Sequence, residues 1–279
     1  MSMQRHSLKF FGTSAAVPSK ERGFSCIGVI SDETNQSGAP SEFGSNGSTS
    51  CILLDCGDGS VRRIIQSGES VFSIRGILIT HLHSDHVSGL AQIIETMAIE
   101  KREQDLMIYG PKGLEDYFAA VERSTRVAFN RNFKIQIKEL AGREHFSISS
   151  TWNVKTLAMN HTIPCLGYRL ETAKEGGEIL TLAYTGDTVP CGEVEELARA
   201  VRVLIHEATF LRKDLPRALE TKHSVPSQAA EIARKAMASR LILTHVNDKY
   251  ESPGEMIEEA KPLFENVQVA FDGLRIDLG

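Results

Sequence analysis

The sequence of 279 residues lacks several features that would place a protein in a specialised class. Its five cysteines are an odd number and include no Cys-x-x-Cys pair, so they indicate neither a disulfide framework nor a thiolate zinc site. Residues 1–6 are polar, and no apolar run approaches the roughly 18 residues of a membrane span. We therefore expect a cytoplasmic protein whose cysteines are reduced and mostly packed in the interior.

An excess of positive charge is also missing. Lysine and arginine number 31 against 36 acidic residues, which gives a formal net charge of −5. This negative net charge does not indicate a nucleic-acid-binding protein, although a net charge can conceal a local basic face. The hydrophobic content of 41% is enough for a sizeable core. No linker, repeat or charge block divides the chain, so we expect a single domain over residues 1–279.

Short apolar runs alternate along the chain with segments of helical spacing. We expect strands over 7–11, 26–31, 49–54, 76–79, 105–109, 133–140, 151–159, 180–187, 201–205 and 241–244 and near 267 and 274, and helices over 61–65, 87–99, 114–122 and 253–264 and from 222. This pattern alone supports an α/β protein and no more. The Gly/Ser/Asn-rich connection 32–48 exceeds a hairpin loop, so it is a flexible excursion or a functional flap, and we favour the first.

A cluster of polar side chains follows the buried strand 76–79. His81, His83, Asp85 and His86 fall within six residues, and imidazole and carboxylate are usual ligands of zinc. His81 and His83 lie two residues apart and share one side of an extended segment, whereas Asp85 and His86 begin a helix and point elsewhere. The cluster therefore fits two metal positions better than one. A polar loop with satisfied histidines is the alternative, and it suits a lone histidine better than this pattern.

Further polar groups stand just after other expected strands. His161 follows 151–159, Asp187 ends 180–187, and His245 follows 241–244. Taken alone, His161 is as consistent with a structural histidine as with a metal ligand. Because the groups recur at strand ends, we expect them to collect along one edge of the sheets.

Several motifs resemble those of a known family. Residues 80–86 read Thr-His-Leu-His-Ser-Asp-His and resemble the metal-binding motif of the metallo-β-lactamase superfamily. Segments 11–18, 54–59, 161–168 and 206–209, the last reading His-Glu-Ala-Thr, resemble its ribonuclease Z-like branch, and the similarity runs nearly end to end. The resemblance implies an α/β fold of four layers, in which two mixed sheets lie face to face with helices outside.

The resemblance also implies two zinc ions per chain and assigns the ligands position by position. One zinc would be held by His81, His83 and His161, the other by Asp85, His86 and His245, with Asp187 bridging the two. Such a pair lowers the pKa of a shared water and neutralises charge on a phosphoryl group. Asp85 would orient the attacking water. Asp55 would hydrogen bond the ligand loops, although it could equally be a turn aspartate.

A proton donor is implied as well. In this branch Glu207 would keep the imidazole of His223 charged and oriented, and His223 would protonate the departing alkoxide. The alternatives are a buried structural carboxylate and a histidine at a helix entry. We expect Ser224 or Ser227 to cap the helix that follows. Val225 stands where the family usually has threonine.

The resemblance makes a tRNA 3′-processing endonuclease the leading function, a phosphodiester hydrolase with precursor tRNA as its partner molecule and a homodimeric subunit. Bacterial members of the branch carry a long arm that grips tRNA, but here only ten residues separate Leu170 from Thr181. Such a length makes a hairpin. The basic residues Arg123, Arg126, Arg131, Lys134 and Lys138 could substitute for the arm or be a solvated surface, and we favour the surface.

Two other functions therefore stay open. One is a hydrolase of small phosphodiester, sulfate or lactone esters that has no tRNA activity. The other is a metal-binding homologue without catalysis, which the complete set of ligand positions disfavours. Neither alternative involves a membrane.

Overall fold

The computed structural model describes residues 5–32, 49–125, 131–173, 177–250 and 252–279. Residues 33–48 of the Gly/Ser/Asn-rich connection, and Arg126, lie outside these ranges, so the expectations for them stay predictions. No helix in the described ranges is both long and apolar enough to cross a membrane.

Two seven-stranded sheets form the centre of the described structure. The first contains, in spatial order, β14 (Arg275–Asp277), β1 (His6–Gly12), β2 (Cys26–Asp32), β3 (Thr49–Leu54), β4 (Ile74–Leu78), β5 (Leu106–Pro111) and β6 (Ile135–Leu140). The second contains β13 (Val267–Val269), β12 (Leu241–Thr244), β11 (Val203–Glu207), β10 (Ile179–Tyr184), β9 (Cys165–Ala173), β8 (Asn153–Met159) and β7 (His145–Ser147). Both sheets are mixed, with a parallel half from β3 to β6 or from β10 to β13 and an antiparallel half beside it.

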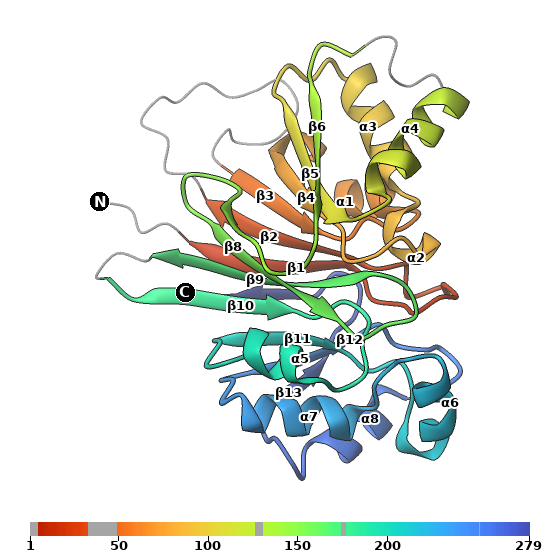
Figure 1. Ribbon diagram of the computed structural model, residues 1–279, viewed down its shortest axis with the longest axis vertical. Coiled ribbons are helices and arrows are strands. Elements are labelled where there is room, and N and C mark those ends of the chain that lie inside the picture. The colour runs from red at the N-terminus through yellow and green to blue at the C-terminus, as the bar shows by residue number, and fades with distance from the viewer. Residues whose placement is uncertain (1–4, 33–48, 126–130, 174–176, 251) are drawn as a thin grey trace.

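Helices cover the outer faces of both sheets. The described helices are α1 (Ser60–Gln66), α2 (Ser84–Val87), α3 (Leu90–Ile99), α4 (Leu114–Thr125), α5 (Gly192–Leu197), α6 (Leu215–Glu220), α7 (Pro226–Lys235) and α8 (Pro253–Ala260), with 3-10 turns at Val71–Ser73 and Arg212–Asp214. Figure 1 shows α3 and α4 outside the first sheet and α7 and α8 outside the second. The expected four-layer arrangement is confirmed.

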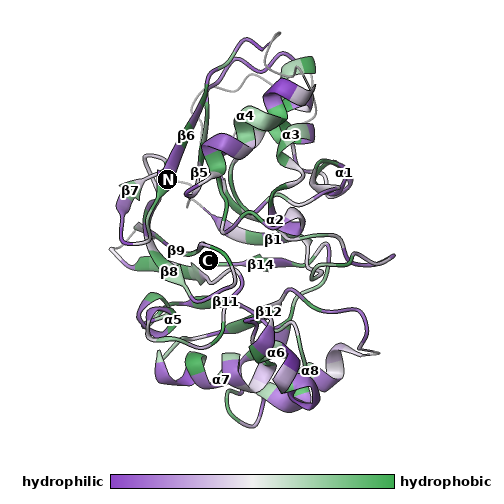
Figure 2. Ribbon diagram, turned by 45° about the vertical axis from the view of Figure 1, so that its right-hand side comes forward, coloured by the Kyte–Doolittle hydropathy of each residue, from purple (hydrophilic) through white to green (hydrophobic). Residues whose placement is uncertain are grey.

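The alternation of side chains along the strands builds three apolar layers. Within β11, Val203 and Ile205 point into the layer between the sheets, whereas Leu204 points into the layer under α5 and α7. Figure 2 shows hydrophilic and hydrophobic stretches alternating along α4 and α7, as expected for helices with one buried face. Burying one leucine side chain completely stabilises the folded state by about 1.5–3 kcal/mol. The packed layers therefore hold the strands in place, and with them the strand ends.

The helix expected to begin at Asp85 and His86 and to continue over 87–99 is in fact two helices. α2 ends at Val87 and α3 begins at Leu90 because the chain turns closely against another loop at Gly89. The Gly89 N–H donates to Cys56 O at 2.8 Å, and a Cβ at Gly89 would lie 2.2 Å from Gly57 O. The helix expected over 253–264 also differs, since it ends at Ala260.

The expectation that a serine caps α7 was wrong. Pro226 occupies the first turn, and this makes Val225 the N-cap residue. The backbone N–H of Val225 donates to the Gln228 side chain at 3.1 Å. Ser224 donates instead to Thr188 O at 2.6 Å, and Ser227 donates to Glu259 at 2.7 Å. Both hydroxyls thus tie the helix start to neighbouring segments.

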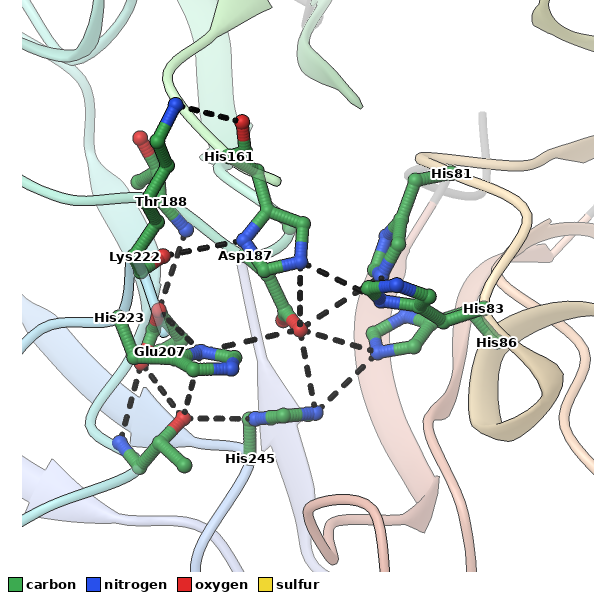
Figure 3. A network of polar contacts seen from close by, with 12 residues as sticks. His81, His83, His86, His161, Asp187, Thr188, Glu207, Lys222, His223 and His245 are labelled. Carbon is green, nitrogen blue, oxygen red and sulfur yellow. Dashed lines mark hydrogen bonds and ion pairs between the residues drawn. The ribbon is translucent and has the colours of Figure 1, made fainter. Parts of the chain in front are cut away.

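The strand directions explain why polar groups gather at one edge. In the second sheet β8, β10, β11 and β12 run in the same direction, because β8 and β10 both pair antiparallel with β9 and the others pair in parallel. In the first sheet β3 and β4 are parallel neighbours. Side chains that follow these strands therefore meet at common edges, and Figure 3 shows them converging from both halves of the chain.

Candidate functional site

The first group of polar side chains consists of His81, His83, His161 and Asp187. Nε2 of His81 lies 3.0 Å from Nδ1 of His83, and Nε2 of His161 lies 3.3 Å from the same atom. Asp187 Oδ2 is 3.6 Å from Nε2 of His81 and 4.0 Å from Nε2 of His161. One donor atom from each of the four residues fits within a 4.8 Å span, which is close enough to surround a single ion.

The second group consists of Asp85, His86 and His245. Nε2 of His245 lies 3.2 Å from Nε2 of His86 and 3.3 Å from Asp85 Oδ2. Asp187 Oδ2 is also 3.6 Å from His86 and 3.4 Å from His245, so this oxygen stands between the two groups (Figure 3). The structure thus brings together all the side chains that the sequence pattern singled out as ligands, and their roles as ligands stay predictions.

In three of these histidines, the ring nitrogen that faces away from the donor groups has a hydrogen-bond partner of its own. His86 Nδ1 donates to Asp55 Oδ2 at 2.7 Å, and His161 Nδ1 donates to the carbonyl of Lys222 at 3.0 Å. Nδ1 of His245 pairs with the hydroxyl of Thr209 at 2.8 Å. A carboxylate or carbonyl on one ring nitrogen fixes the proton there and leaves the lone pair of the other nitrogen directed inward. This is the arrangement that metal-binding histidines use.

Asp55 lies behind the donor histidines and holds several of their neighbours by hydrogen bonds. It is fully buried and adopts a positive φ of 60° at the end of β3. Its carboxylate accepts from the Thr80 backbone N–H at 2.7 Å and from the Tyr184 hydroxyl at 2.8 Å, in addition to His86. Asp55 therefore ties the loop after β4 to a strand of the second sheet, as the supporting interpretation expects and the turn interpretation does not.

The buried imidazoles of the first group favour their neutral forms. Burial, reinforced by the neighbouring His86, lowers the pKa of His81 well below its ordinary value. Burial likewise lowers the pKa of His83 and of His161, in opposition to Asp187. A neutral imidazole keeps a free lone pair, and that is the form in which histidine binds a metal.

The carboxylates of the site favour their ionised forms. Burial alone would raise the pKa of Asp187, but His245 and His86 hold it well below its usual range. The pKa of Asp85 is lowered against its own burial by His245 and then by His86. Burial alone would lower the pKa of His86, but the carboxylates of Asp187 and Asp55 raise it, as expected where negative charge is concentrated.

One oxygen of the donor set is unsatisfied. Asp187 Oδ1 is buried and has no hydrogen-bond partner among the described residues. A buried carboxylate oxygen without a donor is costly unless a cation neutralises it. The ionised carboxylates, and the imidazoles of the first group that favour their neutral forms, point at a common centre and therefore fit a divalent metal ion.

Glu207 and His223 form a pair beside the donor groups. His223 Nδ1 donates to Glu207 Oε1 at 2.9 Å, whereas Asp187 Oδ2 is 3.8 Å away. Glu207 also accepts from the backbone N–H of Thr188 at 3.1 Å and of Thr209 at 3.0 Å. Burial would lower the pKa of His223, but Glu207 raises it to about 9, so His223 is protonated at neutral pH.

Thr209 is a further residue of the candidate site, to which the sequence patterns assigned no role. Its hydroxyl lies 2.6 Å from Glu207 Oε2, 3.2 Å from His223 Nδ1 and 2.8 Å from His245 Nδ1. It therefore contacts both the proton-donor pair and one donor histidine. The signal was its place as the last residue of the His-Glu-Ala-Thr segment 206–209.

The basic residues at 123–138 are partly engaged within the fold. Arg131 pairs with Glu122 at 2.6 Å, and the ammonium group of Lys138 lies 5.6 Å from the Phe146 ring centroid. These contacts agree with a solvated surface in which some charges already have partners.

The chain is similar to known proteins over most of its length. The family described as the beta-lactamase superfamily domain matches residues 51–246. Ribonuclease Z of Bacillus licheniformis is 31% identical over 313 aligned positions, covering 95% of this chain and 96% of that protein, and ribonuclease Z of Methanothermobacter thermautotrophicus is 29% identical, covering 96% and 95%. The crystal structure of the short form of human tRNase Z superposes with a TM-score of 0.76 at 26% identity, covering 98% of this chain and 99% of that one.

Proposed function

The chain belongs to the β-lactamase superfamily and, within it, to the ribonuclease Z family, and from this premise we propose that it is a metal-dependent endoribonuclease that processes the 3′ ends of precursor tRNA. One observation carries the proposal: two groups of metal donors share Asp187 and adjoin a buried glutamate–histidine pair. A leaving alkoxide must be protonated, and the pair supplies a positioned proton for it. We also propose that residues 1–279 form one domain, because strand ends of both sheets contribute side chains to the same group of metal donors.

Two zinc ions per chain are the cofactor that we propose. One would be held by His81, His83 and His161, the other by Asp85, His86 and His245, and both by Asp187. When bound, such ions neutralise charge on a phosphoryl group and lower the pKa of water towards neutrality. Nitrogen and oxygen ligands of this kind suit zinc, and metal analysis that finds only manganese or iron would contradict the proposal.

The residues of the chain perform the remaining steps. Asp85 accepts a hydrogen bond from the attacking water and directs its lone pair towards phosphorus. His223 is charged at neutral pH and donates its proton to the departing oxygen, while Glu207 stabilises that charge and fixes the ring. Thr209 and Asp55 hold the orientation of His245 and His86. Catalysis by the chain is therefore mainly positioning and proton supply.

The natural substrate and the assembly are further parts of the proposal. β9 ends at Ala173 and β10 begins at Ile179, and the alignment with the Bacillus relative has more positions than this chain has residues, so that relative carries insertions that this chain lacks. The short connection favours small phosphodiesters as a second candidate substrate class. By family membership we propose a homodimer, and sedimentation that shows only monomer at micromolar concentration would contradict it.

One experiment tests the function. Hydrolysis of bis(p-nitrophenyl) phosphate and of a precursor tRNA is measured on protein whose metal content has been determined. Cleavage of both with close to two zinc ions per chain supports the leading function, and cleavage of the small ester alone supports the second candidate. Metal binding without hydrolysis would show a non-catalytic homologue. Asp85→Ala should abolish hydrolysis, and activity near that of the wild type would exclude its proposed role.

A further inference from the structure

A cavity of about 220 Å³ opens beside the proton-donor histidine. Among the described metal-donor side chains, His245 alone borders it, next to His223 and Thr209. The donors of the first group, together with Asp85 and His86, are absent from its described lining. The cavity therefore lies on the side of the centre where the proton is given up, away from the first metal-donor group.

The remaining walls combine apolar side chains with polar groups at the margin. The apolar part comes from Ala15, Ala16, Val17 and Phe210, and the polar part from Arg217, Thr221 and Asn247. Val17 is 73% exposed, the largest exposure among the large apolar residues described. An apolar side chain held at the mouth of a cavity beside a catalytic group offers a surface for a ligand.

These walls are anchored before any ligand arrives. The Ser14 hydroxyl donates to the carbonyl of Val17 at 2.6 Å, and the Ala15 N–H donates to Val246 O at 3.0 Å, directly after His245. The loop that carries Val17 is thus fixed relative to the metal donors.

The opposite wall is fixed as well. Phe210 is only 8% exposed because it packs against Ala218 and Val225. The ammonium group of Lys249 lies 5.0 Å from the centre of its ring. A preformed wall does not have to be ordered on binding, so less conformational entropy is lost.

We propose that this cavity binds the nucleoside that leaves when the phosphodiester is cleaved, with its base against Val17 and Phe210. The inference rests on the proposed function, because the group protonated by His223 must be in contact with it. In the step, the oxygen of water bonds to phosphorus, the bond from phosphorus to the nucleoside oxygen breaks, and that oxygen takes the proton of His223. The water loses one proton to the solvent and His223 regains one from the solvent, so the step balances. A flat base suits the apolar walls, and its polar edge can reach Asn247 or Arg217.

Dinucleotides test the inference through rates. The substrates are ApA and its two abasic isomers, each of which lacks one base and keeps both sugars, and the products show which nucleoside leaves. We expect kcat/KM to fall about tenfold when the leaving nucleoside lacks its base, the effect of one stacked base, and to change little for the other isomer. Equal rates for all three substrates would overturn the inference while leaving the hydrolase activity intact.

Substitutions at the mouth of the cavity test whether the preference for a leaving nucleoside with a base arises there. Ala16→Trp fills the cavity and Val17→Ser removes an apolar contact, so both should shrink the ratio between ApA and the isomer that lacks the leaving base. Ile99→Ser is the matched control, because Ile99 is 70% exposed at the end of α3 and should leave that ratio unchanged. A ratio that persists in Ala16→Trp would place the base elsewhere.

Adenosine binding provides a measurement that does not depend on hydrolysis. NMR of the zinc-loaded protein should show the Val17 methyl signals shifting with adenosine, not with ribose, and the shift should be lost in Ala16→Trp. Hydrolysis without this shift would overturn the cavity assignment alone. The shift without hydrolysis would support a nucleoside site and overturn the proposed enzyme. If neither occurs, both are wrong.

Discussion

At the scale of single residues, the site depends on what holds the back of each histidine. A metal-binding imidazole gains little from proximity unless its second nitrogen is fixed, because a free ring samples other orientations and tautomers. Here Asp55, Thr209 and the carbonyl of Lys222 supply that fixation. The residues behind the donors should therefore matter for metal affinity almost as much as the donors themselves.

Asp55→Asn tests this at the best-connected position. An amide accepts more weakly from His86 Nδ1 than a carboxylate does, so we expect zinc affinity to fall about 10–100-fold. Competition with a chromophoric chelator measures the affinity. Asp58→Asn is the matched control, since Asp58 is exposed in the same turn. Zinc affinity equal to that of the wild type would show that Asp55 has only a structural role.

His223→Ala should separate proton donation from metal binding. We expect the zinc content to be retained, and hydrolysis to fall about 10²–10⁴-fold when the leaving group is a ribose hydroxyl. The loss should be much smaller for p-nitrophenolate, which leaves without a proton. Steady-state rates on a dinucleotide and on bis(p-nitrophenyl) phosphate measure both effects. Similar losses on the two substrates would remove His223 from the acid role.

The sequence predicted the donor residues better than their partners. Donors within 81–86 are local in sequence, so strand-to-helix patterning was enough to single them out. Thr209 gave no signal through its residue type, because a threonine hydroxyl has many ordinary uses and only its neighbours Glu207 and His245 give it a role. The serine caps failed for the same reason, since Ser224 found the carbonyl of Thr188 across the fold.

At the scale of elements, the joint between α2 and α3 sets the position of Asp85 and His86. The backbone N–H of Cys56 donates to His86 O at 2.8 Å, and Gly89 returns a bond to Cys56 O at 2.8 Å. Helical spacing predicted the buried face of this region correctly. It could not reveal the interruption, because the interruption depends on a loop about thirty residues earlier in the sequence.

Gly89→Ala should disturb this joint. The added Cβ would stand 2.2 Å from Gly57 O, so backbone must shift, and we expect about 1–3 kcal/mol of destabilisation together with reduced hydrolysis. Gly192→Ala is the control at the start of α5, because a Cβ added there would meet no atom within 4 Å, and it should be neutral or stabilising by about 0.4–1 kcal/mol. Thermal unfolding measures both. Equal melting temperatures for the two variants would contradict the proposed role of Gly89.

At the scale of the whole molecule, alternation of strands and helices predicted an α/β protein and the resemblance predicted four layers. The order of the strands within each sheet could not be predicted from the sequence, since, for example, β14 pairs with β1 across nearly the full length of the chain. This pairing joins segments that are far apart in sequence, so no local window of residues reveals it.

The charge of the whole chain bears on tRNA binding. A net charge of −5 and a short β9–β10 connection leave few basic groups to neutralise phosphates far from the centre. We expect weak tRNA binding, and a lower kcat/KM on precursor tRNA than relatives with a long connection have. A titration of binding against salt should give a shallow log–log slope, whereas a grip on about 6–10 phosphates gives a steep one.

The same salt titration on the Lys134→Gln variant tests whether the basic surface contacts tRNA. If the basic surface is only solvated, the slope should not change in this variant. A steep slope that falls by about one on this substitution would show that the surface replaces the arm. A steep slope unaffected by it would direct attention to residues 32–48.

The donors of the centre are also separated in the order in which the chain is made. His86 and His245 meet at 3.2 Å but stand 159 residues apart in sequence. At a synthesis rate of about 5–20 residues per second, the ribosome releases the second of them on the order of ten seconds or more after the first. A half-made chain can present the donors of 81–86 but cannot complete the second group. The centre that we propose for RNA cleavage therefore cannot be complete before His245 has been synthesised, so the distance in sequence between these donors delays its assembly.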